Sequence, residues 1–148
     1  GAYTGEVSAS QFSGIVKFSL VGHSERRRYF LENKEQIFAK LNLAKETGIV
    51  PIFCFDVPQI DEVFELEDEN LICVYEPVSA IGTGVPDTPE NAKNIANQVK
   101  SKKTNAEVLY GGSVTGENAG DFLKVSDGVL VGTASLDPSE FLAILAKS

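Results

Sequence analysis

The fold is decided by the stretch Cys73-Val74-Tyr75-Glu76-Pro77-Val78-Ser79-Ala80-Ile81-Gly82-Thr83-Gly84, because it joins an apolar run to a glycine-rich loop. Residues 71–75 are typical of a buried strand, and they end at the carboxylate of Glu76. Burial raises the pKa of a carboxyl group toward neutrality, which suits a general base. Gly82-Thr83-Gly84 can turn backbone N–H groups toward an anion or act as a hinged lid. Taken alone, Glu76 is better interpreted as the cap of a neighbouring helix.

On both sides of this stretch, apolar runs alternate with helical patterns. The expected strands are residues 15–21, 49–55, 71–75, 108–110 and 129–131. The expected helices are residues 25–47, a short acidic helix within 58–69, residues 115–124, and two that start at Thr88-Pro89-Glu90 and at Asp137-Pro138-Ser139-Glu140. Strands that are apolar throughout indicate a parallel sheet that is covered on both faces or closed on itself. We therefore predict one α/β domain over residues 1–148.

Helical spacing also predicts which side chains are buried. The helix after Thr88 has an expected buried stripe of Ala92, Ile95, Ala96 and Val99. The first helix has Ile37, Phe38, Leu41 and Ala44 at helical spacing, and the last helix has Phe141, Leu142 and Leu145 on its apolar side. Glu140 lies three residues after Asp137, a spacing typical of a capping box. The two cysteines, Cys54 and Cys73, lie inside apolar runs and are expected to be reduced core residues.

Composition narrows the classes of function. The chain has 148 residues with 13 basic and 21 acidic side chains, and its net charge is −8. This balance argues against nucleic acid and anionic membrane surfaces as partners. An anionic substrate is still possible, because backbone amides can hold it without net positive charge. The single histidine argues against a multi-histidine metal site, and the absence of long apolar runs predicts a cytoplasmic protein without a membrane span.

Polar or glycine-rich groups follow four of the five expected strands. His23 follows the first strand, Glu76 the third, Gly111-Gly112-Ser113 the fourth and Gly132-Thr133 the fifth. Ligands bind at this edge of parallel α/β folds. Each group also has a purely structural interpretation: a core histidine, a helix cap, a tight turn or a helix start. Their shared placement at the carboxyl ends of the strands favours a site.

Four motifs resemble the triosephosphate isomerase family, and they occur in the family's order. They are Gly22-His23-Ser24-Glu25-Arg26-Arg27, Tyr75-Glu76-Pro77-Val78 with Ala80-Ile81-Gly82-Thr83-Gly84, Tyr110-Gly111-Gly112-Ser113, and Val131-Gly132 with Ala134-Ser135-Leu136-Asp137-Pro138. The opening residues 1–8 resemble the family's third βα loop. The resemblance implies a partial TIM (β/α) barrel of about five parallel units, four to eight, which is incomplete within one chain.

The resemblance also implies a role for each motif. Glu76 would be the base that removes a proton beside the substrate carbonyl, and His23 the neutral group that polarises this carbonyl. Ser24 and Glu25 would support the same motif, and residues 77–84 would form the lid. The expected phosphate ligands are backbone N–H groups of Gly82, Ser113, Gly132 and Thr133. The implied substrate is a small phosphorylated triose, in glycolysis and gluconeogenesis, with no metal and no cofactor.

The chain departs from the family pattern in several places. The family carries an Asn-x-Lys motif after its first strand, and the only Asn-x-Lys here, Asn91-Ala92-Lys93, lies within an expected helix. No residue therefore matches the catalytic lysine, and we expect impaired turnover. The lid has Ser79 where the family usually has Trp and Val85 where it usually has Lys. Cys54-Phe55-Asp56-Val57 differs from the family's Cys-x-Gly-Glu.

A five-stranded fragment would have two bare sheet edges, at residues 15–21 and 129–131. Open apolar edges invite pairing with another copy, which predicts a homo-oligomer, a dimer or tetramer. Two other interpretations are possible: a non-catalytic module that binds a phosphate-like anion, and a fragment that needs a separate chain for the first three units.

Overall fold

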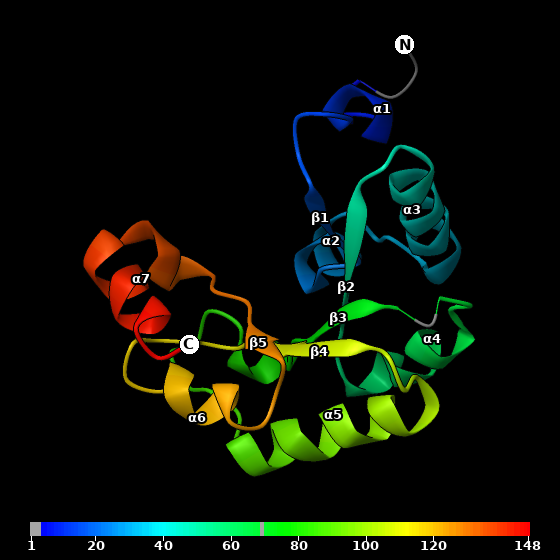
Figure 1. The fold of residues 1–148 in the computed structure, drawn as a ribbon. Helices are drawn as coiled ribbons and strands as arrows, with labels where there is room; N and C mark the ends of the chain where they lie inside the picture. The colour runs from blue at the N-terminus through cyan, green and yellow to red at the C-terminus, as the bar shows by residue number, and fades with distance from the viewer. Residues whose placement is uncertain (1–3, 69) are drawn as a thin grey trace. The chain divides into compact units, whose positions relative to one another are not determined.

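Five parallel strands follow one another in the sheet in the same order as in the sequence. The computed structural model describes residues 4–68 and 70–148. The strands are β1 (Phe18–Val21), β2 (Val50–Phe55), β3 (Ile72–Tyr75), β4 (Glu107–Tyr110) and β5 (Gly128–Val129), hydrogen-bonded in the order β1-β2-β3-β4-β5. Helices separate the strands along the chain (Figure 1). The sheet is not closed, and this architecture confirms the predicted α/β fold of a partial TIM barrel.

The chain divides into two compact units, Gly1–Phe53 and Cys54–Ser148. A single domain over residues 1–148 stays a prediction. The opening motif of residues 1–8 falls partly outside the described residues, which begin at Thr4.

The first unit contains α1 (Ala9–Phe12), β1, α2 (Ser24–Tyr29), α3 (Lys34–Glu46) and the start of β2. The prediction of one helix over residues 25–47 is wrong, because the backbone breaks between α2 and α3. Leu31 has a φ of +53°, a left-handed conformation that ends a helix. The side chain of Asn33 then accepts a hydrogen bond from the Gln36 N–H at 2.9 Å and starts α3.

Burial in the first unit largely follows the predicted helical pattern. Ile37, Leu41 and Ala44 are buried on α3, as predicted, whereas Phe38 is only half-buried. The first strand is shorter than residues 15–21, since β1 begins at Phe18 and the side chain of Ile15 is 77% exposed.

The second unit contains the end of β2 and the strands β3, β4 and β5. Its helices are η1 (Val57–Gln59), α4 (Ile60–Glu65), η2 (Val78–Ala80), α5 (Pro89–Lys102), α6 (Ala119–Leu123), η3 (Thr133–Leu136) and α7 (Pro138–Leu145). Helix α5 packs on β3 and β4 (Figure 1). Thr88 caps it by accepting a hydrogen bond from the Asn91 N–H at 3.1 Å. The predicted buried stripe is confirmed at Ala92, Ile95, Ala96 and Val99.

The last two βα units differ from the prediction in extent. Strand β5 covers two residues, Gly128–Val129, rather than residues 129–131. Helix α6 begins at Ala119 rather than at residue 115, because the side-chain oxygen of Asn118 accepts the Thr115 N–H at 2.9 Å and forms a turn there.

The predicted apolar side of α7 lies mostly on the surface. Ile144 is buried, whereas Phe141, Leu142 and Leu145 are 37%, 64% and 50% exposed. Ala143 of this helix lies close to Gly116, since a Cβ atom at Gly116 would lie 2.7 Å from the Ala143 Cβ. Glu140 stabilises the same contact, because its Oε1 accepts a hydrogen bond from the Gly116 N–H at 2.5 Å.

The core of the second unit is apolar and aromatic. The rings of Tyr110 and Phe122 are stacked, with centroids 3.8 Å apart. Cys54 and Cys73 are buried and not joined in a disulfide, as predicted. Burial, with a smaller contribution from the charge of Asp127, raises the pKa of the Cys73 thiol to about 12. Cys73 is therefore an inert core residue at neutral pH.

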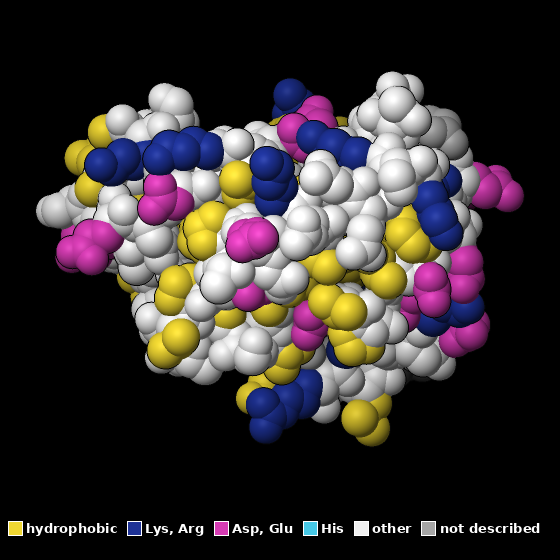
Figure 2. All heavy atoms as spheres, turned by 90° about the horizontal axis from the view of Figure 1, so that it is seen from below, with side chains coloured by type: hydrophobic (Ala, Val, Ile, Leu, Met, Phe, Trp, Pro, Cys, Tyr) yellow, Lys and Arg dark blue, Asp and Glu magenta, His cyan; other side chains and the backbone are white. Residues whose placement is uncertain are grey.

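The surface carries many exposed apolar side chains. Leu31 and Leu136 are 80% and 83% exposed, and Phe18 and Leu20 on β1 are 47% and 45% exposed. On the face in Figure 2, hydrophobic side chains lie among charged groups of both signs. Among the described residues, no helix is both long and apolar enough to cross a membrane.

Candidate functional site

The carboxyl group of Glu76 lies at the carboxyl end of β3, in the interior of the second unit. The residue is 3% exposed, and its backbone N–H donates to the Phe55 carbonyl at 2.8 Å, next to the end of β2. Gly111 follows β4 beside it: a Cβ atom at Gly111 would lie 2.8 Å from the Val74 Cγ1 and 3.2 Å from the Glu76 Cγ. Gly111 is therefore needed for the close approach of β4 to the candidate base.

The lid loop, residues 77–84, is held at its start by Asp56. Oδ2 of Asp56 accepts the Val78 N–H at 3.1 Å, and its Oδ1 accepts the Val57 N–H at 2.7 Å. Asp56 comes directly after β2. From the sequence, it was noted only as a departure from the family pattern. Its position after a strand was the signal that could have identified it.

The other end of the lid loop is held by Ser113, which follows the glycine pair after β4. The Ser113 hydroxyl donates to the Ala80 carbonyl at 2.6 Å and accepts the Gly84 N–H at 3.1 Å. Ser113 has a φ of +47°, and Gly82 and Gly84 have φ values of +67° and +74°. Ser113 thus brings two parts of the lid loop together at the end of β4.

Two tyrosines and Asp87 hold the chain where the lid loop passes into α5. The Tyr110 hydroxyl accepts the Asp87 N–H at 2.9 Å, and the Tyr75 hydroxyl donates to the Asp87 Oδ2 at 2.9 Å. Burial, followed by the hydrogen bond and charge of Asp87, raises the pKa of Tyr75. Gly112 leaves room for the Tyr110 hydroxyl, which would lie 2.6 Å from a Cβ atom there. Sequence reasoning assigned no role to these side chains.

Gly132 and Thr133 lie after β5, the neighbour of β4, and both are exposed. Gly132 precedes η3, and its carbonyl accepts the Ser135 N–H at 2.9 Å and the Ser135 hydroxyl at 2.7 Å. Of the other expected phosphate ligands, Ser113 is hydrogen-bonded to Gly84, and Gly84 lies two residues after Gly82. Gly132 and Thr133 lie at the end of the adjacent strand.

His23, Ser24 and Glu25 belong to the first unit, where they form the start of α2. His23 precedes the helix, and its Nδ1 accepts the Glu25 N–H at 3.3 Å. A ring nitrogen that accepts a hydrogen bond carries no proton, so in the neutral ring the proton is on Nε2. His23 and Ser24 are half-buried, and Glu25 is exposed. His23 thus caps α2 through Nδ1, and its Nε2 carries the N–H.

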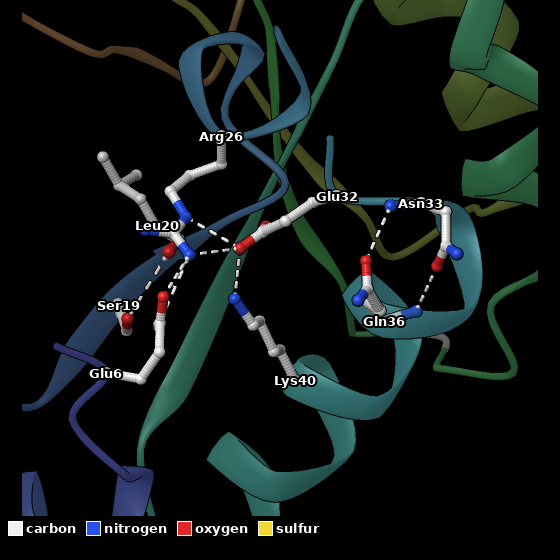
Figure 3. A network of polar contacts seen from close by, with 8 residues as sticks. All are labelled: Glu6, Ser19, Leu20, Arg26, Glu32, Asn33, Gln36 and Lys40. Atoms are coloured by element: carbon white, nitrogen blue, oxygen red, sulfur yellow. Dashed lines mark hydrogen bonds and ion pairs between the residues drawn. The ribbon is translucent and has the colours of Figure 1, made fainter. Parts of the chain in front are cut away.

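An ion-pair network holds the segment after α2 (Figure 3). Glu32 is 9% exposed, and its carboxylate accepts from the Arg26 Nε at 2.7 Å and from the Lys40 ammonium. Arg26 also contacts Glu6 at 3.1 Å. Burial raises the pKa of Glu32, but the hydrogen bonds from Lys40 and Arg26 outweigh it and hold the pKa below its ordinary value. The network connects α2, which begins next to His23, to α3.

Parallel strands that alternate with helices, with a buried carboxyl group and glycine-rich turns at the strand ends, define the α/β proteins that bind ligands at this edge. The family model described as triosephosphate isomerase matches residues 1–148. The chain belongs to the triosephosphate isomerase family.

Curated relatives show the same similarity over the whole chain. The triosephosphate isomerase of Mesomycoplasma hyorhinis is 38% identical over 98% of this chain and 68% of the relative. Those of Thermodesulfovibrio yellowstonii and Buchnera aphidicola subsp. Schizaphis graminum are 39% and 40% identical, and the alignments cover 70% of each relative. The chain thus matches a part of each of these relatives, with about 30% of their length outside the alignment.

Proposed function

We propose that this chain carries the acid–base site of a triosephosphate isomerase and acts on dihydroxyacetone phosphate and glyceraldehyde 3-phosphate. The observation that supports this most is Glu76, a carboxyl group buried at the end of β3, next to a lid loop held by Asp56 and Ser113. A buried carboxyl group is suited to take a proton from carbon. The family is itself a standard example of such tuned groups.

In the proposed reaction, Glu76 takes a proton from the carbon next to the substrate carbonyl and returns it to the neighbouring carbon. The Nε2–H of His23 gives its proton to the carbonyl oxygen, which becomes a hydroxyl in the enediol intermediate. Nε2 then takes the proton of the other hydroxyl, whose oxygen becomes the carbonyl of the product. Ser24 and Glu25 support the histidine from the start of α2. No metal or cofactor takes part in these steps.

Backbone N–H groups hold the phosphate in this proposal. The groups belong to Gly82, Ser113, Gly132 and Thr133. A cradle of neutral amides suits a phosphate ligand in a chain with a net charge of −8, because it needs no cluster of basic side chains. The lid loop would exclude water from the intermediate.

We further propose that turnover by these 148 residues alone is slow. No residue matches the Asn-x-Lys motif of the family, and Asn91-Ala92-Lys93 lies within α5. Removal of one group that stabilises charge in a transition state typically costs about 10²–10³ in rate. Binding of a phosphorylated ligand depends mainly on the backbone amides, so it would survive. A non-catalytic phosphate-binding module is therefore the second candidate function.

A coupled assay in both directions tests the proposal, together with calorimetric binding of 2-phosphoglycolate. We expect slow turnover that is lost in Glu76→Gln and strongly reduced in His23→Gln. The exposed Glu90 at the start of α5 offers a control, because Glu90→Gln makes the same change of charge outside the site. Rates typical of the family would contradict the impairment. Binding without turnover would favour the second candidate, and the absence of both would overturn the proposal.

A homo-oligomer, either a dimer or a tetramer, is proposed as the assembled form. Its support is the exposed apolar side chains on β1, at one end of the strand order. The competing possibility is a separate chain that supplies the remaining βα units. Purification together with a partner that carries Asn-x-Lys would favour that possibility.

A further inference from the structure

Asp87 lies where the lid loop ends and α5 begins, and it contacts the strands that carry the site. Its backbone N–H donates to the Tyr110 hydroxyl of β4 at 2.9 Å. Its Oδ2 accepts the Tyr75 hydroxyl of β3 at 2.9 Å and the Asn91 side-chain amide of α5 at 2.6 Å. Its Oδ1 accepts the Thr88 N–H at 2.7 Å. One residue thus connects the end of the lid to β3, β4 and α5.

The space around the glycines of the lid loop is open, so packing at these positions does not hold the loop. A Cβ atom at Gly82 or at Gly84 would meet nothing within 4 Å. The Gly84 N–H donates to the Ser113 hydroxyl at 3.1 Å, and Asp87 holds the chain three residues further on. Pro86 restricts the backbone between Gly84 and Asp87, so the position of Asp87 is transmitted to the lid.

A carboxylate is well suited to this position. Hydrogen bonds to an ionised acceptor are roughly twice as strong as those between neutral groups. Asp87 is half-buried, and each of its carboxylate oxygens accepts at least one donor. The pKa of Tyr75 is raised, so its hydroxyl keeps the proton that it donates at neutral pH. Tyr75 directly precedes Glu76, so the same contact connects the end of the lid to the strand that carries the candidate base.

We propose that Asp87 is a positioning residue for the phosphate, which fixes the end of the lid loop through Tyr75, Tyr110 and Asn91 so that the Gly82 N–H faces the ligand. The role toward phosphate rests on the proposed function, because that function supplies the ligand. The anchoring of the lid rests only on the hydrogen bonds of Asp87.

Hydrogen–deuterium exchange of the full chain, read by mass spectrometry, tests the anchoring. In Asp87→Ala we expect exchange in the lid peptide to rise roughly tenfold, because several hydrogen bonds to one charged group are lost. Asp87→Asn keeps one carbonyl oxygen as acceptor and should give an intermediate rise. Asp61→Ala is the matched control, since Asp61 is exposed on α4 in the same unit. Unchanged lid exchange in Asp87→Ala would overturn the anchor.

Binding of 2-phosphoglycolate tests the role toward phosphate. We expect its Kd to rise about tenfold in Asp87→Ala, with the thermal midpoint lowered by no more than a few degrees. Tyr75→Phe should have a smaller effect and add little to Asp87→Ala in the double variant, because the two residues share one contact. Additive effects, or unchanged affinity in Asp87→Ala, would overturn the role of Asp87. If the unmodified chain does not bind the probe, the proposed function fails, and lid exchange still decides the anchor.

Discussion

The Ser113 hydroxyl accepts the Gly84 N–H at 3.1 Å, although 29 residues separate the two along the chain. The same hydroxyl donates to the Ala80 carbonyl at 2.6 Å, so one side chain at the end of β4 connects two points of the lid loop. This arrangement makes the lid dependent on residues that lie far away in the sequence.

Loss of the Ser113 hydroxyl should weaken ligand binding. We expect Ser113→Ala to raise the Kd for 2-phosphoglycolate about tenfold, because two hydrogen bonds to the lid are lost while the Ser113 N–H remains. Ser113→Gly should give the same loss of affinity but greater stability than Ser113→Ala, since glycine tolerates the φ of +47°. Calorimetric titration and thermal unfolding measure both effects. Ser139→Ala, an exposed site on α7, should change neither. Unchanged affinity in both Ser113 variants would contradict the role of the hydroxyl.

A side chain at Gly111 should be costly, whereas one at Gly120 should not. We expect Gly111→Ala to lower the free energy of unfolding by about 1–3 kcal/mol, because its Cβ would overlap the Val74 side chain at 2.8 Å. The same Cβ atom would lie 3.2 Å from the Glu76 Cγ and displace this side chain, so turnover should fall as well.

Gly120→Ala in α6 is the matched control. Its Cβ would meet the Lys147 side chain at 3.7 Å, an ordinary contact, and alanine favours a helix. We expect a change between zero and about 1 kcal/mol of added stability. Chemical denaturation measures both variants, and equal destabilisation would contradict the packing argument.

Glu32 should make the stability of the chain depend on pH. Its pKa is lowered in the folded protein, so its contribution is fully present above the ordinary glutamate pKa of about 4.3 and is lost as the pH falls toward the lower folded value. We expect Glu32→Gln to lower the free energy of unfolding at pH 7 by about 1–3 kcal/mol. The difference from the unmodified chain should shrink between about pH 4.5 and pH 3.

Urea unfolding at a series of pH values checks this prediction. Glu35→Gln is the control, because Glu35 is exposed on α3, the helix that also carries Lys40. If the free energies of unfolding of Glu32→Gln and the unmodified chain differ by a constant amount down to pH 3, the charge of Glu32 contributes nothing to stability.

The exposed apolar residues of β1 should drive self-association. We expect the unmodified chain to scatter light as a dimer or tetramer at micromolar concentration, and Leu20→Lys to shift it toward monomer, because charges on an exposed strand block pairing. Leu43→Lys makes the same change at an exposed site of α3, where Leu43 is 52% exposed, and should leave the mass unchanged. A compact, stable monomer of the unmodified chain would rule out the proposed assembly.

The sequence by itself determined the order of the elements and the groups at the strand ends. Local signals were sufficient for this: apolar runs for β2 and β3, and Thr88-Pro89 with a four-residue apolar stripe for α5. The positions of Glu76, Ser113 and His23 after their strands also followed from the sequence, because a residue after a strand lies at that strand's end whatever the rest of the chain does.

Tertiary structure decided which side of α7 is buried and which residues hold the lid. Phe141 and Leu142 are apolar in sequence, yet they are exposed, and Ile144 is buried instead. Asp87 carries no local pattern that distinguishes it from other carboxylates, and Asp56 is marked only by its position after β2. They hold the lid through hydrogen bonds to residues on other elements, and such bonds exist only once the strands and α5 have packed together.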